Sequence, residues 1–149
     1  MENSRENLLK LLDKDLLKKI LRAFTNATGL TANIVDVNGS SIFSKNDAQS
    51  NCRFCKLIWE KQKEKRLYRC NASYARAGKQ AAIFGEAYIF RCPAGLIEWA
   101  VPIIIDKKHM GSIICGQVLM WEPEEFFWIE LREMNKELFD DFDSLFQAA

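Results

Sequence analysis

Four of the five cysteines in this 149-residue chain lie between positions 52 and 92, at the spacing C-x2-C-x14-C-x21-C. Thiolates are ligands for zinc and for iron–sulfur clusters, and a C-x2-C pair lets two sulfurs reach one metal from a single turn. The pattern predicts a zinc or iron–sulfur site formed by Cys52, Cys55, Cys70 and Cys92. Zinc knuckles usually contain two C-x2-C pairs, however. Burial of the isolated Cys70 and Cys92 as small apolar side chains is therefore an equal alternative.

Thiol–disulfide chemistry is the other reaction open to Cys52 and Cys55. Redox C-x2-C pairs normally lie at a helix N-terminus, where the pKa of the attacking thiol is lowered, and the neighbouring Arg53 has the same effect. No thioredoxin-like βαβ pattern precedes this pair. A thiol-dependent enzyme is therefore the least favoured interpretation, whereas a metal- or redox-sensing module stays open as an alternative function.

The composition indicates one ordinary globular domain. Apolar residues make up 48% and charged residues 28% of the chain, and the net charge is +1. This balance gives no electrostatic reason to expect direct binding to nucleic acid or to an anionic membrane surface. The sequence has no apolar run of about 18 residues and no N-terminal signal layout, so we expect a cytoplasmic protein without membrane contact. Structural disulfides are rare in that compartment.

The N-terminal segment, residues 1–29, is predicted to be helical from Glu6 to Asn26 because leucines and isoleucines recur there at three- and four-residue steps. Asp13 can cap a second helical segment, which allows a break near Leu12. Gly29 is suited to the left-handed conformation that ends many helices.

Residues 31–37 are rich in β-branched side chains and are predicted to form a strand. Asn38-Gly39 is a strong hairpin signal, and it predicts a returning strand at 41–44. Gly78 lies inside a predicted helix, where it indicates a close helix approach. Further helices are predicted at 54–68 and 71–84, and further strands at 87–92, 96–105 and 110–119.

The closing segment, residues 122–149, is predicted to be one amphipathic helix that begins at Glu122-Pro123-Glu124 and continues nearly to Ala149. Its apolar stripe suits either pairing between subunits or packing on its own sheet. Together the elements predict an α+β, PAS- or GAF-like fold. In this fold a five-stranded antiparallel sheet in a core at 30–121 is flanked by helices, with N- and C-terminal helices outside it.

Aromatic residues from the predicted helices and strands are candidates for the wall of a pocket for a small organic molecule. Gln117 lies within an apolar strand, where its amide can both donate and accept hydrogen bonds. By strand alternation, Glu98 is expected to face solvent. The chain has no Ser-His-Asp set and no Gly-rich phosphate loop, so catalysis is not expected. The candidate ligand-binding residues are Phe54, Trp59, Tyr74, Phe90, Trp99, Cys115 and Gln117.

The order of these landmarks resembles the PocR sensory domain family over about residues 10 to 120. The landmarks are Cys52-Arg53-Phe54-Cys55, Cys70, Cys92-Pro93-Ala94-Gly95-Leu96, Pro102-Ile103, Gly111 and Gly116-Gln117-Val118.

This resemblance implies a PAS-like module that senses small hydrocarbon derivatives such as diols. It also implies bacterial signalling proteins with histidine kinase, cyclic-dinucleotide or DNA-binding output domains, and a homodimer formed through the terminal helices is compatible with it. Family members commonly have His where this chain has Pro93, so no role of that His is transferred.

Overall fold

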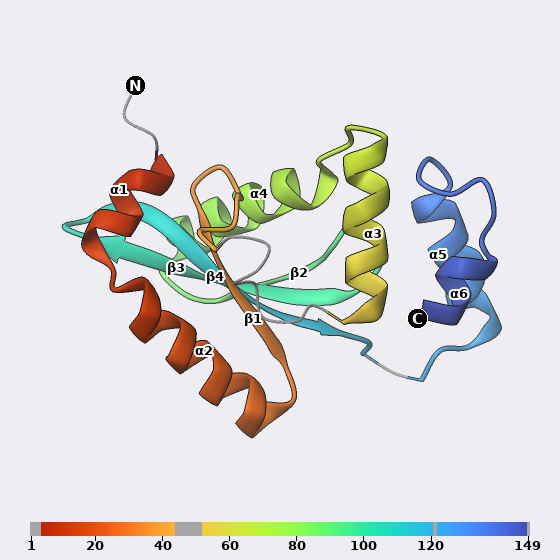
Figure 1. Cartoon of the computed structure of the whole chain (residues 1–149), viewed down its shortest axis with the longest axis horizontal. Coiled ribbons are helices and arrows are strands. Elements are labelled where there is room, and N and C mark those ends of the chain that lie inside the picture. Colours follow the sequence, from red (N-terminus) through yellow and green to blue (C-terminus); the bar gives the residue numbers. More distant parts are fainter. Residues whose placement is uncertain (1–3, 44–51, 121, 149) are drawn as a thin grey trace.

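The computed structural model describes residues 4–43, 52–120 and 122–148. Within these ranges it has six helices and one antiparallel four-stranded sheet of order β1-β4-β3-β2 (Figure 1). The α+β class with flanking helices is therefore confirmed. In chain order the elements are α1 (Ser4–Leu11), α2 (Lys14–Thr28), β1 (Thr31–Asp36), α3 (Arg53–Glu64), α4 (Arg69–Phe84), β2 (Tyr88–Arg91), β3 (Ile97–Ile105), β4 (Lys108–Val118), α5 (Glu125–Asn135) and α6 (Asp143–Ala148).

The predicted break in the N-terminal helix is confirmed, and its cause is local. The Asp13 carboxylate accepts hydrogen bonds from the backbone N–H groups of Asp15 and Leu16, both at 3.0 Å, and so caps α2. Gly29 ends α2 with a φ of 72°, a conformation that costs glycine little.

The predicted strand at 41–44 is wrong for the residues that the structure describes. Gly39 does form the turn, with a φ of 76°, but Ser41 makes only an isolated bridge to Val35. The Asp36 carboxylate accepts hydrogen bonds from the backbone N–H groups of Asn38 and Ser40, which closes this segment as a loop. Position 44 lies outside the described residues. The sheet therefore has four described strands instead of five, and the PAS- or GAF-like arrangement stays a prediction.

Helices cover both faces of the sheet, and each face has its own apolar core. The first core lies between the sheet and α3, α4, α5 and α6, and it includes Ala100 and Ile114. The second lies against α1 and α2 and includes Ile34 and Cys115. Neighbouring residues of β4 therefore point into different cores, as strand geometry requires.

The close approach predicted at Gly78 is confirmed. A Cβ at this position would collide with Oγ of the buried Ser112, so α4 lies directly against β4. Ser112 is also 3.0 Å from Nε2 of His109. His109 is half-buried in β4, because Asp106 and Lys107 alone make the turn before it, with positive φ values.

The single closing helix expected at 122–149 is instead two helices, α5 and α6. The backbone N–H of Leu138 bonds to the carbonyl of Asn135 at 2.9 Å, which turns the chain after α5. The apolar stripe then folds back, so that Leu131, Leu138 and Leu145 are all buried in the first core. The part of the stripe within the described residues packs on its own domain.

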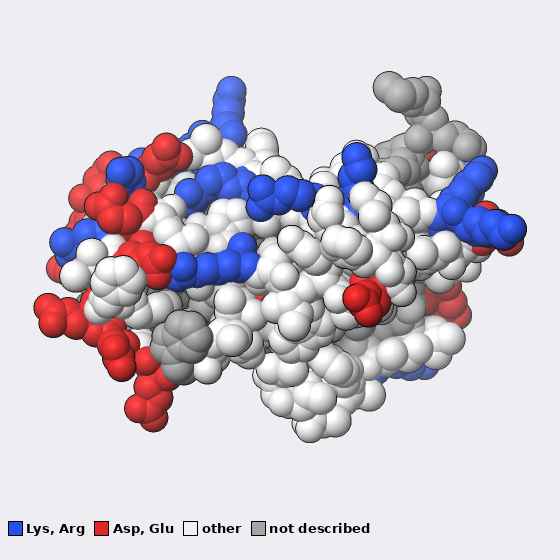
Figure 2. Space-filling model, turned by 180° about the vertical axis from the view of Figure 1, so that it is seen from behind, with Lys and Arg blue, Asp and Glu red and all other residues white. Residues whose placement is uncertain are grey.

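None of the helices in the described ranges is long and apolar enough to span a membrane. In the view of Figure 2, acidic side chains gather at the end of the molecule where α5 lies, and a broad uncharged area covers the middle.

Candidate functional site

Glu98 of β3 is the centre of the candidate site, and our expectation that it faces solvent is wrong. Its side chain is 1% exposed and points, with Ala100, towards α4. Strand alternation was read correctly, but it does not say whether the second face of a sheet is covered. Here α4 covers that face, so Glu98 and Ala100 are buried.

The Glu98 carboxyl has one protein partner and one unpaired oxygen. The Tyr74 hydroxyl donates to Oε1 at 3.3 Å, whereas Oε2 is buried and has no hydrogen-bond partner among the described residues. Burial raises the pKa of Glu98 to about 8, and the hydrogen bond from Tyr74 opposes that rise. Glu98 is therefore mostly protonated at neutral pH and can donate a hydrogen bond as well as accept one.

The cysteines of the sequence cluster lie around Glu98. Cys55 lies in the first turn of α3, Cys70 in the first turn of α4 and Cys92 directly after β2, and all three are buried in the first core. Burial raises the pKa of Cys70 to about 11 and that of Cys92 to about 12, and the charge of Glu98 contributes to both. These thiols stay neutral at physiological pH and act as small, weakly polar side chains beside the carboxyl.

Gln62 was missed by sequence reasoning, although it holds one of these cysteines. Its Nε2 donates to Cys70 Sγ at 2.9 Å, and its Oε1 accepts from the Cys70 backbone N–H at 3.1 Å. This reciprocal pair joins the last turns of α3 to the first turn of α4. The available signal was a glutamine on the apolar face of a predicted helix.

Cys52 differs from the buried cysteines because it is half-exposed and precedes α3 as its N-cap. Its Sγ accepts the backbone N–H of Cys55 at 3.4 Å, and its own N–H donates to Oε1 of Gln117 at 3.4 Å. A hydrogen bond from the Cys55 side chain is the main cause that lowers the pKa of Cys52 to about 6, and burial partly opposes it. Gln117 itself is an extra residue in β4 with a φ of 62°, at a bulge opposite β3.

The sheet divides the seven candidate ligand-binding residues. Phe54 and Tyr74 are buried in the first core, and Trp59 and Phe90 pack against it, on the same face as Glu98. Trp99 and Cys115 belong to the second core on the opposite face, and Gln117 lies at the bulge beside Cys52. The structure thus places four of them on the same face of the sheet as Glu98, where Tyr74 contacts its carboxyl, and their contact with a ligand stays a prediction.

Within residues 4–43, 52–120 and 122–148, no group of three or more His, Cys, Asp or Glu side chains is arranged to hold a metal ion. Zinc or iron–sulfur binding by Cys52, Cys55, Cys70 and Cys92 therefore stays a prediction from their spacing.

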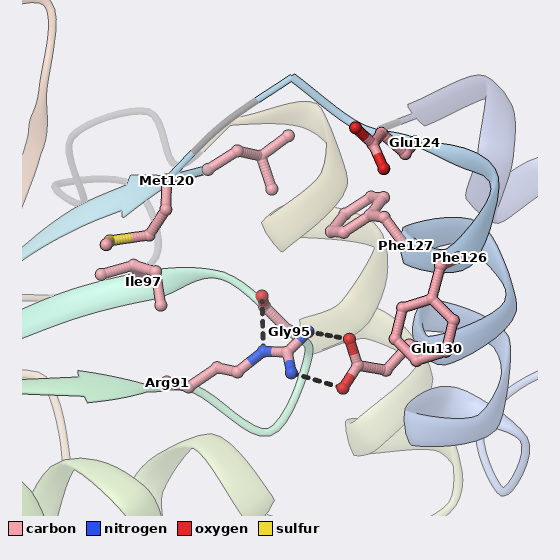
Figure 3. A pocket seen from close by; sticks show the side chains of 9 residues that line it. Arg91, Gly95, Ile97, Met120, Glu124, Phe126, Phe127 and Glu130 are labelled. Carbon is pink, nitrogen blue, oxygen red and sulfur yellow. Dashed lines mark hydrogen bonds and ion pairs between the residues drawn. The ribbon is translucent and has the colours of Figure 1, made fainter.

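An open pocket of about 210 Å³ lies elsewhere, between the end of the sheet and α5 (Figure 3). Arg91 of β2 makes a two-pronged ion pair with Glu130 of α5, at 2.6 and 2.8 Å, and its Nε donates to the carbonyl of Gly95 at 3.2 Å. Glu130 thus neutralises the Arg91 guanidinium, and Glu124 is the remaining charged residue of the pocket lining. None of its lining residues is among the ligand-binding candidates chosen from the sequence. They are Arg91, Gly95, Ile97, Leu119, Met120, Glu124, Phe126, Phe127 and Glu130.

Comparison with known proteins identifies relatives over most of the chain. Residues 10–149 match the family described as the sensory domain found in PocR. The Regulatory protein PocR of Salmonella typhimurium (strain LT2) is 32% identical over 107 residues, which are 72% of this chain and 34% of that protein. The chain therefore spans about a third of the length of this curated relative. No solved structure gives a significant match.

Proposed function

Since the chain belongs to the family of PocR sensory domains, we propose that it senses a small organic molecule for a regulatory protein and has no catalytic activity of its own. The ligand we propose is a short hydrocarbon derivative with hydroxyl groups, such as a diol. The observation that carries this proposal is the unpaired Oε2 of Glu98, buried beside the Tyr74 hydroxyl.

A buried polar atom without a partner destabilises a protein by roughly 1–3 kcal/mol, so a molecule that supplies the missing hydrogen bond is bound favourably. A ligand hydroxyl can accept from the protonated Glu98 carboxyl and can donate to it. Phe54, Cys70 and Cys92 surround this part of the core with apolar or weakly polar groups. Such surroundings favour a small neutral ligand with a short carbon chain over a charged one.

The contacts between α4 and α5 support a route by which ligand binding acts on the C-terminal helices. Arg69 of α4 donates to the carbonyl of Met134 at 2.8 Å and to Oδ1 of Asn135 at 3.2 Å. The Asn135 amide in turn donates to the carbonyl of Ala94 at 3.4 Å. Arg69 precedes Cys70, and Ala94 follows Cys92 by two positions. The C-terminal end of α5 is therefore hydrogen-bonded to the segments that carry Cys70 and Cys92.

We propose that a ligand beside Glu98 shifts these segments and therefore α5. The ligand acts on an equilibrium between two arrangements of these segments. It can change that equilibrium only by the difference between its affinities for the two arrangements. The output domain, the homodimer through terminal helices and the cytoplasmic location belong to the same proposal.

The test is thermal unfolding of the chain with a panel of short alcohols and vicinal diols. A ligand at one hundred times its Kd stabilises by about 2.7 kcal/mol. For a domain of this size the melting temperature then rises by roughly 5–10 °C. We expect at least one diol to produce this rise in the wild type, a smaller rise in Glu98→Gln and none in Glu98→Leu.

Glu86→Gln, which changes an exposed carboxyl, is the matched control and should respond like the wild type. Equal rises in the wild type and in Glu98→Leu would place the ligand elsewhere. No rise with any compound at tens of millimolar would refute the diol proposal.

A further inference from the structure

Cys52 and Cys55 form a thiol pair that ligand sensing does not use. Both lie at the start of α3, and Cys52 Sγ accepts the backbone N–H of Cys55 at 3.4 Å. This contact places the Cys52 sulfur beside the first turn of α3, next to the backbone of Cys55.

The two thiols differ in the ways that a redox pair requires. Cys52 is half-exposed, whereas Cys55 is 6% exposed in the first core. Cys52 is also the N-cap of α3, and a helix N-terminus stabilises a thiolate. The accessible sulfur is therefore placed to act as the nucleophile, and the buried Cys55 follows it within the first turn.

The other described cysteines do not share this combination. Cys70 and Cys92 are buried, and each has a raised pKa. Cys115 is buried in the second core on the opposite face of the sheet, and burial raises its pKa as well. A soluble oxidant that enters from solvent therefore meets one reactive thiolate, with one thiol in contact behind it.

We propose that Cys52 and Cys55 form a reversible disulfide across the first turn of α3, with Cys52 as the sulfur that reacts with a hydroperoxide. The formation of this disulfide does not require the ligand proposed for the Glu98 site.

The chemistry balances in two steps. The Cys52 thiolate attacks the O–O bond of hydrogen peroxide. An S–OH bond forms, the O–O bond breaks, and the leaving hydroxide takes a proton from water or a nearby acid. The Cys55 sulfur, after loss of its proton, then attacks the Cys52 sulfenic sulfur and releases hydroxide, which that proton converts to water. Overall one peroxide is reduced to two waters while two thiols become one disulfide. An external dithiol then reduces the disulfide to two thiols and is itself oxidised to a disulfide.

The disulfide would also change the contacts of the candidate ligand site. In the reduced chain the Cys52 sulfur caps α3, and the Cys52 N–H holds Gln117 at the bulge of β4. The charge of Cys52 contributes to the raised pKa of Glu98, and the charge of Glu98 contributes to the raised pKa of Cys55. A neutral disulfide removes the thiolate charge, so oxidation and ligand binding are expected to affect each other.

The experiment is titration of the reduced, metal-free chain with hydrogen peroxide, followed by alkylation, proteolysis and mass spectrometry. We expect a loss of two alkylatable thiols and a Cys52–Cys55 disulfide within one peptide, reversed by dithiothreitol. Cys55→Ser should stop at a sulfenic acid on Cys52 that dimedone traps, and Cys52→Ser should react with peroxide at least tenfold more slowly. Cys70→Ser is the matched control and should form the same disulfide as the wild type.

A disulfide that includes Cys70, Cys92 or Cys115 as its main product would overturn the proposal, and so would equal peroxide rates in the wild type and Cys52→Ser. Circular dichroism spectra of each serine variant show whether it is folded. If Cys52→Ser is not folded, the wild type still decides the question through the identity of the linked peptide.

Discussion

Ionisation of the buried Glu98 should make the folded state less stable as the pH rises, and this is the sharpest consequence of the structure. The carboxyl is 1% exposed, and burial raises its pKa from 4.5 to about 8 in the folded chain. Between these two pH values the unfolded chain has lost the Glu98 proton and the folded chain has kept it. Unfolding therefore releases a proton, and the free energy of unfolding falls with rising pH.

The magnitude follows from the two pKa values. Well below pH 4.5 the carboxyl is neutral in both states and contributes no penalty. Through the window up to pH 8 the loss is about 1.4 kcal/mol per pH unit, and above pH 8 it levels off at a total of about 5 kcal/mol. Between pH 5 and pH 7 we expect the wild type to lose about 2–3 kcal/mol relative to Glu98→Gln, whose amide does not titrate.

Urea unfolding at half-unit pH steps from 5 to 8.5 measures this difference. The other titrating groups are shared by the two proteins, so their contributions largely cancel in the comparison. Glu86→Gln removes an exposed carboxyl and should follow the wild-type curve. Parallel curves for the wild type and Glu98→Gln would refute the reasoning, because they would show that Glu98 is ionised as easily in the folded chain as in the unfolded one.

Two further substitutions test the packing around the site. Gln62→Leu should cost roughly 1–3 kcal/mol in urea unfolding because Cys70 loses both of its hydrogen bonds to that amide, and an unchanged free energy of unfolding would show that the pair contributes nothing. Gly78→Ala should cost roughly 1–3 kcal/mol, despite the better helix propensity of alanine, because the new Cβ meets Ser112 Oγ. Adding Ser112→Ala should recover part of that loss, and a Gly78→Ala variant more stable than the wild type would contradict the close contact.

The elements that the sequence predicted well are those whose cause is local. Asp13 caps α2 through bonds to residues two and three positions away, and Gly29 ends that helix by its own conformation. The strands β2, β3 and β4 follow from alternation and from the turn at Asp106 and Lys107, within two residues of the predicted bounds. Periodicity and turn chemistry act over a few residues, so they can be read without the fold.

The errors arise where another interaction competes with the pattern. The strand expected at 41–44 required continuous pairing with β1. In the described residues the Asp36 carboxylate instead holds the chain after β1 in a loop. The closing stripe was compatible with one long helix, and the bond from Leu138 to Asn135 divides it. In each case a side chain or the core competes with a local preference, and the sequence pattern does not show which wins.

The candidate site shows the same division. Sequence alone selected the four cysteines, Tyr74 and the aromatic residues near them, because spacing and residue type are visible along the chain. It placed Trp99 and Cys115 in the same pocket, although the sheet separates them from Glu98. It assigned Glu98 to solvent, since alternation gives the face of a side chain but not what covers that face. Only the packing of α4 on β3 made this carboxyl buried, mostly neutral and half-paired, and these are the properties on which the proposed function depends.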